Sequence, residues 1–171
     1  MLIKQIIDVY DLLDDSRVDG RTVVDYLRTI DPEVNAETYP LTGPRGTTHM
    51  LKVRIPGSDG KSSGGNTPTL GILGRLGGLG ARPEMIGYVS DGDGALAALA
   101  IAVKLLDMKK KRDVLPGDIF ISTHICPDAP TKAHDPDPFM GTPVDIYQVK
   151  QEELSPELDA IFSIDTTKGN R

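Results

Sequence analysis

The chain has 171 residues and a net charge of −6, a length typical of one domain that buries a core without a disulfide or metal. An acidic chain with no Trp does not predict nucleic-acid binding, which needs a basic surface. The single Cys excludes an internal disulfide and favours a reducing compartment, so we expect a cytoplasmic protein. No apolar run reaches the ~20 residues of a membrane span. The acidic N-terminal segment is unlike a signal peptide, so no membrane partner is expected.

Two amphipathic helices are predicted at the start of the chain. Apolar residues recur at helical spacing over residues 2–13 and again over residues 20–30. Asp19 stands where a helix N-cap is expected, and Pro32 follows the point where the second helix should end.

The next segments are rich in Gly and Pro. Residues 34–47 are predicted to form a loop, and residues 49–55 a strand that ends at Pro56-Gly57. Residues 57–66 (GSDGKSSGGN) form a Gly/Ser-rich segment that we expect to be flexible. Thr67 and Pro68 then resemble the start of a helix that carries Leu70, Leu73 and Leu76 on one face.

The second half alternates predicted strands and helices. Strands are expected over residues 85–90 and 118–123, joined by a long Ala/Leu-rich helix over residues 94–111. After a loop over residues 124–143, the expected elements are a strand at 144–149, a helical turn at 152–158 and a buried strand at 159–164. The alternation predicts a single α/β domain, residues 1–171, with a mostly parallel sheet and helices on both faces.

Polar residues follow three of the predicted buried strands. Asp91 follows the first, His124 and Asp128 follow the second, and Asp165 ends the third. Ligands of open α/β sheets bind at the carboxyl ends of the strands, so these residues are expected to converge. Carboxylates brought together need a positive partner, and Asp with His suits zinc, manganese or cobalt. The alternative is that such Asp residues serve as helix caps, as Asp93 could.

The loop after residue 124 is dense in metal-donor side chains. His134 lies there and is the fourth candidate metal ligand, beside Asp91, Asp128 and Asp165. The alternative for this loop is a solvated acidic segment with Asp-Pro turns. Cys126 could act as a nucleophile with a His as its base, but a Cys just after a buried strand is usually part of the core.

Two glycine-rich segments and one further His resemble functional motifs. The segment at 57–65 does not have the P-loop spacing, because residue 55 is Ile where the motif needs Gly. Residues 74–83 contain no dinucleotide-binding fingerprint. His49, at the start of a predicted strand, is expected to be structural rather than a ligand.

Four segments resemble a prokaryotic family known only as a domain of unknown function. They are SDGDGALAAL at 90–99, THICPDAP at 123–130, PFMGTPVD at 138–145 and SIDTTKGNR at 163–171. This resemblance spans nearly the whole chain and implies no activity.

A more distant resemblance is to the di-zinc exopeptidases, which include aminopeptidases, carboxypeptidases and deacylases. The run from Asp91 to Ala98 is similar to the segment of those enzymes that begins with a metal-bridging Asp, and the strand before Asp165 is similar to one that ends in a metal ligand. The resemblance implies that Asp91 bridges two metals and that Asp128 and Asp165 bind them. The family's Glu-Glu pair is absent, since Pro127 and Asp128 stand there, and His124 is the substitute base that we consider.

These patterns predict a metal-dependent hydrolase of peptide or other amide bonds. The expected cofactor is one or two divalent ions, zinc foremost, and the expected substrate is a small peptide or an acyl-amino-acid-like molecule. The alternative is an exopeptidase-like scaffold without catalysis that binds a small molecule or peptide, or forms an oligomer. Because a last ligand of the family would fall after residue 171, we expect an N-terminal part of a larger domain, associated with a C-terminal portion or with itself. This predicts an exposed apolar sheet edge near residues 159–165.

Overall fold

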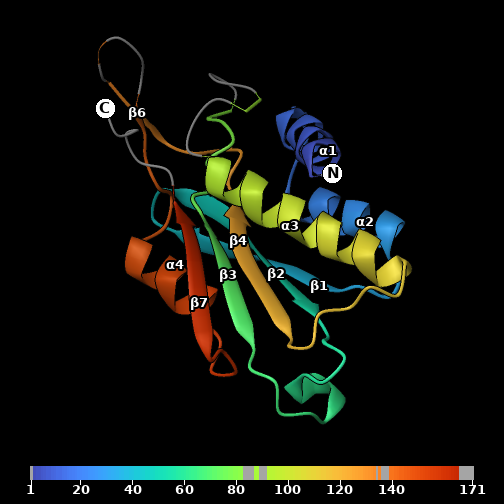
Figure 1. The fold of residues 1–171 in the computed structure, drawn as a ribbon. Helices are drawn as coiled ribbons and strands as arrows, with labels where there is room; N and C mark the ends of the chain where they lie inside the picture. Colours follow the sequence, from blue (N-terminus) through green and yellow to red (C-terminus); the bar gives the residue numbers. More distant parts are fainter. Residues whose placement is uncertain (1, 83–86, 89–91, 134, 136–138, 166–171) are drawn as a thin grey trace, which may run out of the picture.

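The computed structural model describes residues 2–82, 87–88, 92–133, 135 and 139–165. A five-stranded sheet in the order β1-β2-β4-β3-β7 forms its centre (Figure 1). Its elements in chain order are α1 (Ile3–Asp14), α2 (Gly20–Ile30), β1 (Asn35–Gly43), β2 (Gly46–Ile55), a 3-10 turn η1 (Lys61–Ser63), β3 (Leu70–Arg75), α3 (Asp93–Lys110), β4 (Ile119–Ile125), β5 (Thr131–Lys132), β6 (Phe139–Met140), α4 (Ile146–Glu153) and β7 (Ala160–Asp165).

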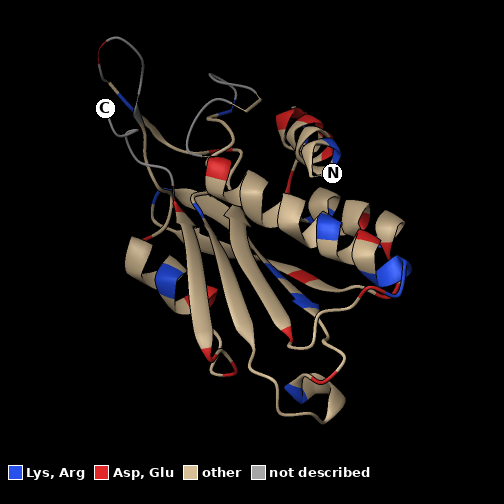
Figure 2. Cartoon of the chain, viewed as in Figure 1, with Lys and Arg blue, Asp and Glu red and all other residues tan. Residues whose placement is uncertain are grey.

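The sheet is mixed. Strands β4, β3 and β7 run parallel to one another, and β2 and β1 extend the sheet in antiparallel pairings beyond β4. Strands β3 and β7 carry a charged residue only at their last positions, Arg75 and Asp165, and β4 carries none, so these strands are tan over most of their length in Figure 2. Their carboxyl ends therefore form one edge of the sheet where polar side chains collect.

Helices cover both faces of the sheet, as predicted. On β2, Leu51 and Val53 point to the face covered by α1, α2 and α3, and belong to the main core. Met50 points to the opposite face and packs with Val149 of α4 in a smaller core. This alternation follows from the two-residue period of a strand. The α/β class with helices on both faces is confirmed.

The three amphipathic or apolar helices are confirmed close to their predicted bounds. The predicted cap of α2 is also present, because the Asp19 carboxylate accepts a hydrogen bond from the Thr22 amide at 2.7 Å. The expected strands at 49–55, 118–123 and 159–164 correspond to β2, β4 and β7. Local signals are sufficient for these elements because the helices, β2 and β4 bury apolar side chains and β7 is a distinct short apolar run.

Two predictions in the first half were wrong. Residues 34–47, expected as a loop, form β1 and the turn into β2, since Asn35–Gly43 pairs with β2 over its whole length. The segment after Thr67, expected as a helix, forms β3 between β4 and β7. Gly74 allows α3 to approach β3, because a Cβ there would lie 2.4 Å from the Gly94 carbonyl oxygen.

Further differences concern three other segments. Residues 144–149, expected as a strand, contain the start of α4, which Asp145 caps by accepting from the Tyr147 amide. The segment at 57–66, expected to be flexible, contains η1, which Asp118 anchors through the Gly57 and Ser62 amides at 2.8 Å each. Most of the expected strand at 85–90 lies outside the described residues.

Strand β7 forms the outer edge of the sheet and was expected to be buried. Its apolar side chains are exposed instead, at 51% for Ile161 and 59% for Phe162. The exposed apolar edge expected near residues 159–165 is therefore present. The other edge strand of the sheet is β1.

Candidate functional site at the carboxyl edge of the sheet

Three side chains lie side by side at the carboxyl ends of the parallel strands. The register pairs Arg75 with Asp165 across β3 and β7, and pairs Met50 with His124 across β2 and β4. Because facing residues share a face, His124, Arg75 and Asp165 all lie on the face that α4 covers. Arg75 ends β3, which lies between β4 and β7. The sequence predicts that the ends of β4 and β7 meet the end of a third strand, the one before Asp91.

His124 is buried and uses both ring nitrogens within the protein. Its Nε2 accepts a hydrogen bond from the Gly77 amide at 3.1 Å, so Nδ1 carries the proton and donates to Thr48 Oγ1 at 2.9 Å. Burial lowers the pKa of His124 to about 4. In this arrangement the neutral imidazole joins β4 to the segment that follows β3. Its one lone pair on nitrogen accepts from the Gly77 amide and is not available to a ligand.

Arg75 forms a partly buried ion pair with α4. Its Nη2 lies 2.7 Å and its Nε 2.9 Å from Glu153 Oε2, and the Glu153 side chain is only 2% exposed. Burial raises the pKa of Glu153, although Arg75 opposes the shift, and the nearby Asp165 charge adds to it. The pair neutralises Arg75 and leaves the Glu153 carboxylate close enough to Asp165 for their charges to interact.

The remaining candidates have different surroundings. Asp128 is exposed in the turn after β4, whereas Cys126 is 2% exposed. Burial raises the pKa of the Cys126 thiol to about 11, which keeps it protonated at neutral pH and disfavours a nucleophilic role. Asp91 and His134 lie outside the described residues.

The described donor side chains do not by themselves form a metal site. Within the described ranges, no group of three or more His, Cys, Asp and Glu could hold a metal ion. His124 is committed to Thr48 and Gly77, which leaves Asp165 and Asp128 as the described members of the predicted ligand set. A metal site at this edge would need ligands from outside the described residues, where the predicted ligands Asp91 and His134 lie.

His49, which the sequence predicts to be structural, has a structural contact. Its Nδ1 accepts a hydrogen bond from the Gly20 amide at 2.9 Å, at the start of α2. His49 therefore joins α2 to β2.

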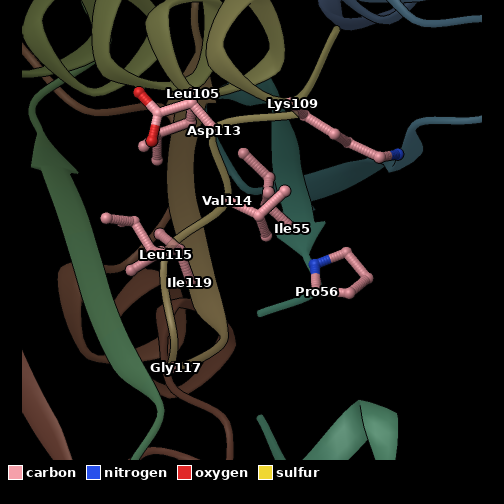
Figure 3. Close-up of a pocket in the computed structure, with 9 residues that line it drawn as sticks. All are labelled: Ile55, Pro56, Leu105, Lys109, Asp113, Val114, Leu115, Gly117 and Ile119. Atoms are coloured by element: carbon pink, nitrogen blue, oxygen red, sulfur yellow. The ribbon is translucent and has the colours of Figure 1, made fainter. Parts of the chain in front are cut away.

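A pocket opens beside His124. It has a volume of about 270 Å³ and lies between the end of β4, the turns around β5 and β6, and the start of α4. A second pocket lies at the other end of the sheet, among Ile55, Leu105 and Ile119 (Figure 3). At about 10 Å³ it holds no more than about one water molecule, so the pocket beside His124 is the better ligand site.

Three solved structures were compared with the fold of this chain. The bottromycin maturation enzyme BotP is 14% identical, with a TM-score of 0.54 over 96% of this chain and 42% of that chain. A mutant of tomato leucine aminopeptidase is 10% identical, with a TM-score of 0.48 over 81% of this chain and 30% of that chain. Cytosol aminopeptidase from Coxiella burnetii is 12% identical, with a TM-score of 0.47 over 74% of this chain and 31% of that chain. The chain thus spans less than half the length of these proteins, and the likeness to BotP establishes a shared α/β fold.

The family itself follows from the sequence of the chain. Residues 40–171 match the family described as "Protein of unknown function (DUF1177)", and the chain belongs to that family. This confirms the predicted membership of a family without an assigned activity. A comparison with curated proteins finds no match. No helix among the described residues is long and apolar enough to cross a membrane.

Two site features were missed by sequence reasoning. Arg75 was assigned to a helix, so its place at the end of a parallel strand went unnoticed. Its partner Glu153 is far along the chain and lies in a segment whose start was taken for a strand. The signal that could have found them is the charge of Arg75 directly after the short apolar run LGILG, a pattern typical of a buried strand that ends at a site.

Proposed function

We propose that the chain carries the amide-binding edge of a metal-dependent hydrolase of peptide or other amide bonds. One observation supports this above the others: three parallel strands end together beside the first turn of α3, with Asp165 at that edge. The approach is close, because a Cβ on Gly94 would lie 1.9 Å from the Arg75 carbonyl oxygen. In the sequence, Asp91 stands two residues before the first residue of this turn, Asp93.

In this proposal Asp91, Asp165, Asp128 and His134 are the metal ligands, and zinc is the expected ion. When bound, such an ion supplies Lewis acidity and a water of lowered pKa. The residues of the chain bind and orient the amide. Arg75, held by Glu153, lies beside Asp165 in the pairing of β3 with β7. His124 has a positioning role, because its hydrogen bonds hold the Gly77 amide and the Thr48 hydroxyl.

The test combines metal binding with turnover. The chain is expected to take up zinc or manganese in calorimetric titration and to hydrolyse members of a panel of N-acyl amino acids and aminoacyl amides. Asp91→Asn and Asp165→Asn should each lower metal affinity and turnover by about 100-fold or more, since ligand loss removes both. Asp11→Asn, an exposed carboxylate on α1, is the matched control and should change neither.

Two results would contradict the proposed hydrolase function. A folded chain that binds neither ion at millimolar concentration and turns over no member of the panel contradicts the proposal. Equal losses in Asp11→Asn and Asp165→Asn would also contradict it, because the effect would then come from net charge.

A second candidate function is binding without catalysis on the same scaffold. It is favoured by the state of the described edge residues, since His124 is neutral and fully bonded and Arg75 is paired with Glu153. Those two side chains therefore supply no general base. This candidate predicts metal-independent binding of small peptides or acyl amino acids with no turnover.

A further inference from the structure

The pocket beside His124 has an apolar floor. Leu76, Ala129 and Ile146 line it together with Cys126 and Met140, which are at most 7% exposed. Cys126, Ala129 and Met140 also belong to one small apolar cluster that stands apart from the main core. A surface of this kind favours an apolar group of a ligand, which would remove the remaining apolar area from water.

The polar side chains of the floor are already satisfied within the protein. His124 bonds Thr48 and the Gly77 amide, and the Thr142 hydroxyl bonds the Val144 carbonyl. Neither is therefore free to hold a polar ligand group. Recognition of charge in this pocket falls to the side chains at its rim.

Two cations stand at the rim of the pocket. Arg45 lies in the turn between β1 and β2, and Lys132 lies in β5. An ideal Cβ on Gly141, in the facing wall, would lie 4.0 Å from Arg45 Nη1, which places the guanidinium at the pocket mouth. Neither cation has an ion-pair partner within the part of the chain that the structure describes, whereas Lys52, Arg54 and Arg75 each lie near a carboxylate.

We propose that this pocket binds a small carboxylate with an apolar substituent, of the size of one hydrophobic N-acyl amino acid. The carboxylate lies between Arg45 and Lys132, and the apolar substituent lies on Cys126 and Met140. In an acidic protein, two cations that pair with no carboxylate among the described residues, beside an apolar floor, are complementary to this ligand class and to no cation. The volume of about 270 Å³ lies just below the roughly 300–1,000 Å³ of drug-sized pockets, which fits a ligand of this size. That the ligand is a substrate or product of amide hydrolysis rests on the proposed function.

The experiment follows the methyl group of Met140 by NMR in protein labelled at the methionine methyls, with Met140→Leu as the assignment. N-acetyl-leucine is the probe, and N-acetyl-leucinamide, which lacks the carboxylate, is its matched partner. The acid should shift the Met140 signal until the signal change saturates. The amide should bind more weakly than the acid by at least about tenfold. Arg45→Gln and Lys132→Gln should each weaken the acid about tenfold, while Lys111→Gln, an exposed cation after α3, should leave its affinity unchanged.

Each result decides the question. An unshifted Met140 signal at millimolar acid, equal affinities for acid and amide, or an equal loss in Lys111→Gln overturns the pocket assignment. The readout needs no turnover, so it separates the two proposals. Binding at Met140 in a chain that hydrolyses nothing would support the pocket assignment and contradict the proposed hydrolase function. Turnover without binding at Met140 would support the hydrolase function and contradict the pocket assignment.

Discussion

Single side chains at the carboxyl edge have roles that follow from their burial. Glu153 is 2% exposed, and its carboxylate is stabilised by Arg75, whose side chain is 26% exposed. A buried charge without a partner costs several kcal/mol, but a buried pair replaced by apolar groups is often neutral. Stability at this position therefore depends on the match between the two residues more than on the presence of either.

The pair can be tested by a double-mutant cycle. Arg75→Met should destabilise the protein by about 2–4 kcal/mol, because Glu153 is left buried and unpaired. The double variant Arg75→Met with Glu153→Leu should recover at least half of that loss. Urea unfolding at pH 7 gives the four free energies. Strictly additive losses in the double variant would show that the two side chains do not act as a pair.

Close approach between elements depends on residues without side chains. Strand β3 lies against the first turns of α3, and Gly74 is one of the contact points. The same glycines that weaken any helix in this segment allow β3 to fit between α3 and the other strands. The glycine content of this segment, which is unfavourable for a helix, thus suits a strand that is closely covered by α3.

Substitution of Gly74 tests this packing. Gly74→Ala should destabilise the protein by about 3 kcal/mol, because its Cβ would lie 2.4 Å from the Gly94 carbonyl oxygen and 2.7 Å from the Ala98 Cβ. Gly64→Ala is the control: its φ of +80° is strained for Ala but nothing lies within 4 Å, so about 1 kcal/mol is expected. Thermal and urea unfolding measure both. A larger loss for Gly64→Ala would contradict the close packing of β3 against α3.

The stability of the whole molecule should depend on pH through His124. At neutral pH the ring is uncharged in the folded and unfolded states, and it contributes no pH dependence. As pH falls below about 6.5, the unfolded chain takes up a proton that the folded protein refuses until about pH 4, so stability decreases through that window. The full effect is of the order of 3 kcal/mol.

This pH dependence has a direct measurement. The free energy of unfolding should fall between pH 7 and pH 4.5 in the wild type and fall much less in His124→Gln, which cannot take up a proton. Carboxylates with lowered pKa values, such as Asp31 and Asp118, lose their contribution only as pH falls below about 4, outside this interval. A parallel pH profile in the two proteins would mean that His124 does not control it.

The carboxyl edge was predictable in part. Asp165 and His124 were identified as strand-end residues because β4 and β7 are short apolar runs followed by polar residues, and a parallel sheet gathers such ends. The strand between them could not be predicted, because the Gly-rich segment that forms β3 and ends at Arg75 has the local pattern of a weak helix. The hydrogen bonds of His124 also cannot be predicted from the sequence, because its partners Thr48 and Gly77 are distant in the chain. They meet His124 only through the pairing of β2 with β4 and the course of the chain after β3.

The sequence by itself determined the helices α1, α2 and α3, the α/β class and the strands whose apolar runs are locally distinct. These properties depend on periodicity and end signals that act within a few residues. Tertiary structure decided that a glycine-rich segment becomes a central strand, that Arg75 pairs with Glu153, and that Arg45 and Lys132 meet at one pocket. The physical reason is that strand pairing, burial of charge and pocket shape are set by contacts between residues far apart in the chain, whose free energy exceeds the local preferences of each segment.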